Sequence, residues 1–122
     1  MTTESLKFIN DLMESLEIPY EYMEWESASM PNPFFVGSYV DNTTETHEED
    51  GSSESVFTLY GVGTTWMVLE EVKDKLININ ETAILPHGSI AVYFNNSQHL
   101  PSEDGRLKRI QIQLTVKEWS VI

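Results

Sequence analysis

The stretch KRIQIQLTVK, residues 108–117, alternates apolar and polar side chains along its whole length. Ile110, Ile112, Leu114 and Val116 fall on one side of an extended chain, and the residues between them are charged or polar. A period of two residues predicts a β-strand with one face buried and the other in water. Such half-buried strands are typical of antiparallel sheets, so this stretch predicts an antiparallel sheet that is covered on one face.

Two helices are predicted to cover that face. The first begins after Thr2 or Thr3, carries apolar residues at helical spacing, and is expected to end at Pro19. The second is expected to begin after Thr64 or Thr65, because apolar residues again recur there at helical spacing: Trp66, Leu69, Val72 and Leu76.

Four further strands are predicted from β-type composition, at Tyr20–Trp25, Phe34–Val40, Ser55–Tyr60 and Ser89–Phe94. The order is then α-β-β-β-α-β-β, which defines an α+β fold with a mainly antiparallel sheet of about five strands and both helices on one face. A length of 122 residues indicates a single domain, residues 1–122.

Two connections complete this prediction. Gly61–Thr65 is expected to form a turn that leads into the second helix, since it holds two glycines and two candidate capping threonines. Residues 95–105 are rich in Asn, Ser, Gly and Pro and are expected to form the turn before the last strand. The last strand itself, residues 108–118, is expected to offer an edge to neighbouring chains.

Residues 41–54, DNTTETHEEDGSSE, show no pattern of buried side chains. If the strands on either side pair, this segment is a long hairpin loop, and loops of this length are usually functional or disordered. We expect the loop to be mobile and to contact a partner. The candidate contact residues are its acids and the aromatic pair that follows two prolines: Asp41, Glu45, Glu48, Glu49, Asp50, Glu54, Phe34 and Phe35. The alternative for the two phenylalanines is packing in the core.

The charge is strongly negative and unevenly distributed. The net charge is −13, and residues 1–54 hold thirteen acids but one base, Lys7. Acidity can serve solubility alone, but a field of this sign also repels nucleic acid and anionic membranes, so specific binding to either is not expected. An acidic N-terminus without a long apolar run indicates no signal peptide and no membrane span, so a soluble protein made inside the cell is expected.

The sequence predicts no enzymatic site. There is no cysteine, which excludes disulfides and thiolate chemistry. The Gly61–Thr65 segment lacks the lysine of a phosphate-binding loop, and His47–Asp50 lacks the spacing of a zinc or calcium motif. No serine stands in a nucleophile motif. Catalytic residues, cofactors and bound metals are therefore not expected.

Three stretches together resemble a known family: FFVGSY, then SVFTLYGVGTTWMVLEEVKDKL, and later GSIAVYF with LPSEDGRLKRIQIQLTVKEW. This phrasing, which covers residues 20–119, resembles the tail terminator, or tail completion, proteins of long-tailed bacteriophages. The resemblance implies a hexameric ring in the tail and neck region of the virion, assembled in the bacterial cytoplasm. Its implied partners are other copies of the chain, the tail tube protein and a head–tail connector protein.

The resemblance also implies that residues 41–54 face the lumen of the ring or a neighbouring protein. Clustered carboxylates suit a lumen through which DNA must slide without binding. An alternative function is an acidic DNA mimic that inhibits a host nuclease or restriction enzyme, which the charge of residues 1–54 favours. A different small virion protein with the same fold is a third interpretation, because fold alone does not determine function.

Overall fold

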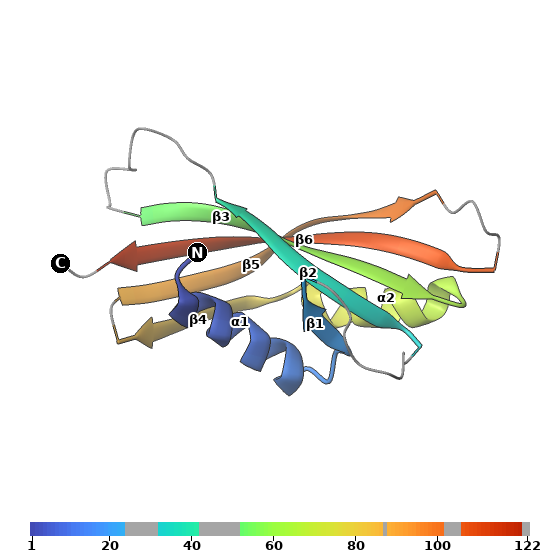
Figure 1. Ribbon diagram of the computed structural model, residues 1–122, viewed down its shortest axis with the longest axis horizontal. Helices are drawn as coiled ribbons and strands as arrows, with labels where there is room; N and C mark the ends of the chain where they lie inside the picture. Colours follow the sequence, from blue (N-terminus) through green and yellow to red (C-terminus); the bar gives the residue numbers. More distant parts are fainter. Residues whose placement is uncertain (24–31, 42–51, 87, 102–105, 121–122) are drawn as a thin grey trace.

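A computed structural model of the chain describes residues 1–23, 32–41, 52–86, 88–101 and 106–120. Within these ranges it contains two helices and one six-stranded sheet, which is the α+β class predicted from the sequence. The elements are α1 (Thr3–Ser15), β1 (Tyr20–Tyr22), β2 (Phe34–Asp41), β3 (Ser52–Gly63), α2 (Trp66–Leu76), β4 (Asn80–Leu85), β5 (Gly88–Leu100) and β6 (Lys108–Ser120) (Figure 1).

The strands lie in the order β1-β2-β3-β6-β5-β4. All neighbouring pairs are antiparallel except β1 and β2, which run parallel, so the sheet is mixed but mainly antiparallel as predicted. β2 and β3 form the expected antiparallel pair, with Phe34 opposite Val62 at one end and Asp41 opposite Ser55 at the other. β6 pairs with β3 on one side and β5 on the other, so the prediction that it offers an edge is wrong.

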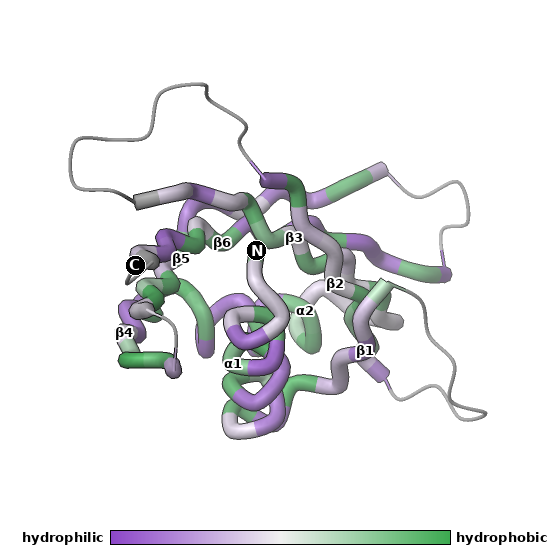
Figure 2. The backbone as a smooth tube through the Cα atoms, turned by 60° about the vertical axis from the view of Figure 1, so that its left-hand side comes forward, coloured by the Kyte–Doolittle hydropathy of each residue, from purple (hydrophilic) through white to green (hydrophobic). Residues whose placement is uncertain are grey.

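The sheet curls, and both helices lie on its inner side (Figure 2). We call this side the covered face and the opposite side the open face. The predicted alternation in β6 is confirmed, because its four apolar residues on the covered face are fully buried. The fully buried core combines both helices with the inner sides of four strands: Ile9, Met13, Phe35, Phe57, Leu59, Leu69, Leu76, Val92, Ile110, Ile112, Leu114 and Val116.

Both helices begin with a threonine cap, as predicted. The Thr2 hydroxyl accepts a hydrogen bond from the Ser5 amide, and the Thr65 hydroxyl accepts one from the Val68 amide. α1 ends at Ser15, before Pro19, because Glu17 turns the chain with a φ of 57°. The Ile18 amide then donates to the Met13 carbonyl, which closes a left-handed C-terminal cap that is more often made by glycine.

Two local predictions about the first three strands need correction. Gly61–Gly63 belong to β3 rather than to a turn, and a Cβ on Gly61 would overlap the ring of its cross-strand partner Phe35. Glycine is therefore required there by the close approach of an aromatic ring, not by a bend. The predicted strand Tyr20–Trp25 is shorter, since β1 ends at Tyr22, and Trp25 lies outside the described residues.

The other corrections concern β4 and β5. β4 was not predicted, and it forms one edge of the sheet beside β5. β5 continues to Leu100, through residues expected to form a turn. A register shift between Phe94 and Asn96 marks the change, and beyond it the side-chain amide of Asn96 donates to Gln113 on β6 at 2.9 Å. Cross-strand bonds of this kind allow polar residues to continue a strand.

Candidate functional site

The predicted contact residues do not form one site in the described structure. Glu45, Glu48, Glu49 and Asp50 lie outside the described residues. Asp41 and Glu54 do not lie in a loop, because they belong to β2 and β3. Their placement shows that strand pairing extends into both ends of the predicted loop.

The aromatic pair beside the prolines is largely internal. Phe35 is fully buried in the core, so the prediction that it makes an exposed contact is wrong. Phe34 is half-buried at the start of β2. The alternation of β2 places Phe35, Gly37 and Tyr39 on the covered face. Which of the two adjacent phenylalanines is buried depends on this register, and the sequence alone did not predict it.

Asp41 has a structural role at the end of β2. Its carboxylate forms an ion pair with the N-terminal ammonium of Met1 and accepts a hydrogen bond from the Ser55 hydroxyl at 2.6 Å. These two contacts, the ammonium first, hold the pKa of Asp41 below its usual value. Asp41 therefore ties the start of the chain to the β2–β3 hairpin.

Glu118 is a buried carboxylate that the sequence analysis did not single out. It is 8% exposed and lies at the N-terminus of α1. Its Oε2 accepts hydrogen bonds from the Ser5 hydroxyl at 2.6 Å and from the Thr2 hydroxyl and amide at 3.1 Å each. A carboxylate is favoured at this end of a helix, where amide groups are unpaired and the helix dipole is positive. Its position two residues after Val116, in phase with the buried side, is the sequence signal for burial.

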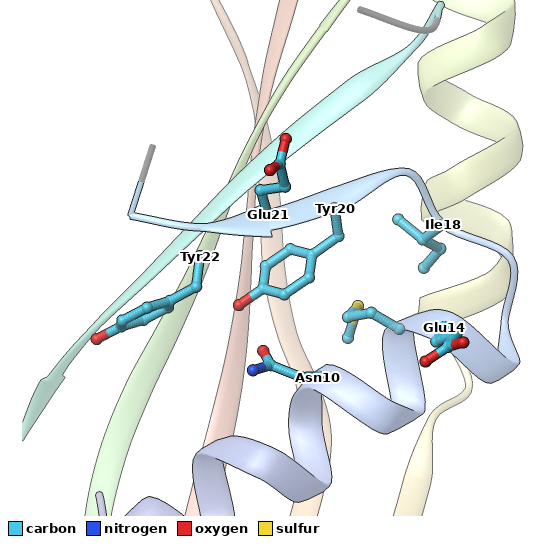
Figure 3. A pocket seen from close by; sticks show the side chains of 7 residues that line it. Asn10, Glu14, Ile18, Tyr20, Glu21 and Tyr22 are labelled. Atoms are coloured by element: carbon cyan, nitrogen blue, oxygen red, sulfur yellow. The ribbon is translucent and has the colours of Figure 1, made fainter. Parts of the chain in front are cut away.

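A pocket of about 350 Å³ lies between α1 and β1 (Figure 3). Asn10 and Met13 line it from the helix, and Tyr20 and Tyr22 line it from the strand. Ile18 contributes an apolar wall, and Glu14 and Glu21 add two acids. Asn10 Oδ1 and the Tyr20 hydroxyl are both buried and have no hydrogen-bond partner among the described residues. Burial raises the pKa of Tyr20 well above its usual value of 10.0, so its hydroxyl stays protonated.

A second, apolar groove of about 650 Å³ crosses β4, β5 and β6 at the sheet edge. Ile84, Ser89 and Trp119 are consecutive cross-strand partners, so they share the open face. Ile84 is 92% exposed, which is unusual for a side chain of this size in a strand. The groove therefore presents apolar surface beside a strand whose outer edge pairs with no other strand among the described residues.

A polar cluster joins α2 to the C-terminal part of β5. His99 Nε2 lies 2.6 Å from Glu70 Oε1, and the His99 ring packs on Trp66 with 4.5 Å between ring centroids. Lys73 also pairs with Glu70, one helical turn away. The Lys73 ammonium, with a smaller contribution from His99, holds the pKa of Glu70 below its usual value.

Neither a comparison with models of known protein families nor one with curated proteins finds a match for this chain. In the part of the chain that the structure describes, no group of three or more His, Asp or Glu side chains is placed to hold a metal ion. No described helix has the length and apolar character needed to span a bilayer.

Proposed function

We propose that this chain is a non-enzymatic subunit of an oligomeric ring that caps the tail tube of a long-tailed phage and joins it to the head. Its partners would be further copies of itself, the tail tube protein and a head–tail connector protein. The proposal rests on the resemblance of residues 20–119 to tail terminator proteins, and on one structural observation, that β4 forms an outer edge of the sheet among the described residues.

The β4 edge is suited to association with another chain. Its sequence, NETAIL, contains neither lysine nor proline, and Glu81 is the one charged residue that could oppose pairing at this edge. Its unpaired backbone groups can accept an added strand, and the adjoining groove can accept an apolar side chain. The exposed Ile84 side chain would be removed from water in such a contact.

Charge opposes this assembly. Each added copy brings a net charge of −13, and like charges repel over about 8 Å at physiological ionic strength. Ring formation should therefore strengthen as salt rises, because screening weakens repulsion while apolar burial is retained. An association that relied on ion pairs would weaken under the same change.

The test measures the mass of the purified protein by light scattering, with negative-stain imaging, at low and at about molar salt. Closed rings are expected, and Ile84→Lys should reduce the assembled fraction by tenfold or more, on the order of the cost of burying an unpaired charge. Val40→Lys is the matched control, because Val40 is also an exposed apolar residue on a strand but lies on β2. Rings should persist in this control.

Two outcomes would refute the proposal. One is a monomer at every salt concentration, even when preformed tail tubes are supplied as a template. The other is a tight complex of the monomer with a DNA-cleaving enzyme, which would favour the DNA-mimic function instead. Deleting residues 42–51 separates the two functions further, because a mimic should lose inhibition whereas the ring contact at β4 should remain.

A further inference from the structure

The pocket between α1 and β1 contains two buried oxygen atoms without a partner. Asn10 reaches it from the helix and Tyr20 from the strand, and Figure 3 shows the two side chains pointing toward one another. Neither Asn10 Oδ1 nor the Tyr20 hydroxyl has a hydrogen-bond partner among the described residues. Buried polar atoms in folded proteins are nearly always paired with protein groups or with bound water, so these two atoms mark a place where a hydrogen-bonding group is expected to bind.

The chemistry of these atoms restricts that group. An amide oxygen only accepts hydrogen bonds, and a tyrosine hydroxyl has lone pairs that accept as well as one proton to donate. A group placed between Asn10 and Tyr20 must therefore bring N–H or O–H donors to satisfy the amide oxygen. A group with several donors could satisfy both oxygen atoms at once.

The charge and shape of the walls restrict it further. The described lining residues include no base, and Glu14 brings an acid from the helix. Glu21 also belongs to the lining, but Figure 3 shows its side chain pointing away from Asn10 and Tyr20. Met13 and Ile18 supply apolar contact for an aliphatic chain, and the tyrosine rings favour a cation over an anion. The volume, about 350 Å³, lies at the small end of the range for ligand pockets.

We infer that this pocket binds a guanidinium or ammonium group carried on an aliphatic stem. The group can come from a free diamine or guanidine compound, or from an arginine or lysine side chain of a partner protein. In either case its N–H donors would pair with Asn10 Oδ1 and the Tyr20 hydroxyl, while its stem packs on Met13 and Ile18. The inference goes beyond the ring function and does not depend on it.

The test is a titration of the isotope-labelled full-length protein, followed by backbone amide NMR. The probes are agmatine, butyrate as an anion with a similar stem, and a short peptide with one central arginine beside its alanine counterpart. Agmatine and the arginine peptide should shift the signals of Asn10, Tyr20 and Tyr22, and butyrate and the alanine peptide should not. The tighter of the two binders then identifies whether the source is a small molecule or a protein side chain.

Two variants test the assignment of the oxygen atoms. Asn10→Leu and Tyr20→Phe should each weaken agmatine binding by about tenfold, the usual order for a lost hydrogen bond to a charged group. Tyr93→Phe, on β5, is the matched control and should bind as the parent does. Neither pocket variant should lower the unfolding midpoint, because the removed atoms have no partner within the described structure.

The inference is overturned if agmatine causes no shift at tens of millimolar, or if butyrate binds equally well. It is also overturned if both pocket variants bind agmatine with parental affinity. Repeating the titration with the Ile84→Lys variant separates this question from assembly, because Ile84 lies on β4, away from the pocket lining. Binding by this variant would support the inference even if rings never form.

Discussion

The two faces of the sheet are built from the same strands but have opposite properties. In β6, Ile112 and Leu114 are fully buried on the covered face, whereas Gln111 and Gln113, which alternate with them, lie on the open face. The covered face holds the fully buried core, and the open face is mainly polar at its centre. Alternate residues of the same strands therefore form the packed core on one face and the solvent-facing surface on the other.

The open face is not uniformly polar: Tyr60 is exposed on the inner strand β3, and the two most exposed apolar strand residues lie nearer the edges of the sheet. Ile84 on the edge strand β4 and Val40 near the end of β2 are among its most exposed apolar residues. Ile84 also adjoins the apolar groove, whereas Val40 does not line it. This is why the ring proposal assigns the contact to β4 rather than to the whole open face.

The largest expected effect is the difference in unfolding free energy between two isoleucine-to-alanine substitutions, one on each face of the sheet. Ile112→Ala removes a fully buried side chain from the covered face and should lower the free energy of unfolding by about 2–5 kcal/mol. Ile84→Ala removes the same atoms where they are exposed, so the change should stay within about 0.5 kcal/mol. Urea denaturation monitored by tryptophan fluorescence measures both. Equal losses would contradict the division between the two faces.

The sequence predicted the covered face better than the open face. The alternation of β6, the two capped helices and the β2–β3 pair follow from local patterns. β4 was missed because its first three residues, Asn80, Glu81 and Thr82, are all exposed and carry no alternation. An edge strand buries little of its own surface, so its sequence gives a weak signal.

The candidate pocket could not be predicted from local patterns either. Asn10 follows a buried residue in a helix, and Tyr20 lies in a strand of three residues. They approach each other because β1 pairs in parallel with β2, with Tyr20 opposite Phe35. That pairing is a tertiary contact, and periodicity along the chain carries no information about it.

The second-largest expected effect is the loss of stability when Glu118, the buried carboxylate on the covered face, is removed. Glu118→Ala leaves the buried Ser5 hydroxyl and the Thr2 amide without their acceptor, which should cost about 2–3 kcal/mol of unfolding free energy. Hydrogen exchange should also speed up in the first turn of α1. Glu81→Ala is the matched control, because Glu81 is an exposed acid on a strand, and its effect should stay within about 0.5 kcal/mol. A loss no larger than this control would show that Glu118 does not anchor the helix.

The smallest expected effect is the contribution of Glu70, on α2, to the pH dependence of stability. Because Glu70 has a lowered pKa in the folded state, its contribution to stability is present above the unfolded pKa and is lost as pH falls through the folded pKa. The contribution is small, since both side chains of the pair with Lys73 are partly exposed to solvent. Side-chain carbonyl NMR should show the pKa of Glu70 rising toward 4.5 in Lys73→Met, and rising less in His99→Gln.

Lys75→Met is the matched control for that titration. Lys75 lies on the same helix, but its ammonium donates to the Leu16 carbonyl at 3.0 Å rather than to Glu70. Its removal should therefore leave the pKa of Glu70 unchanged. If Lys75→Met raised this pKa as much as Lys73→Met, the shift would come from the general charge of the helix, and the specific pair would not be its cause. Comparing the pKa of Glu70 among the three variants therefore distinguishes a specific contact from the general electrostatic field of the helix.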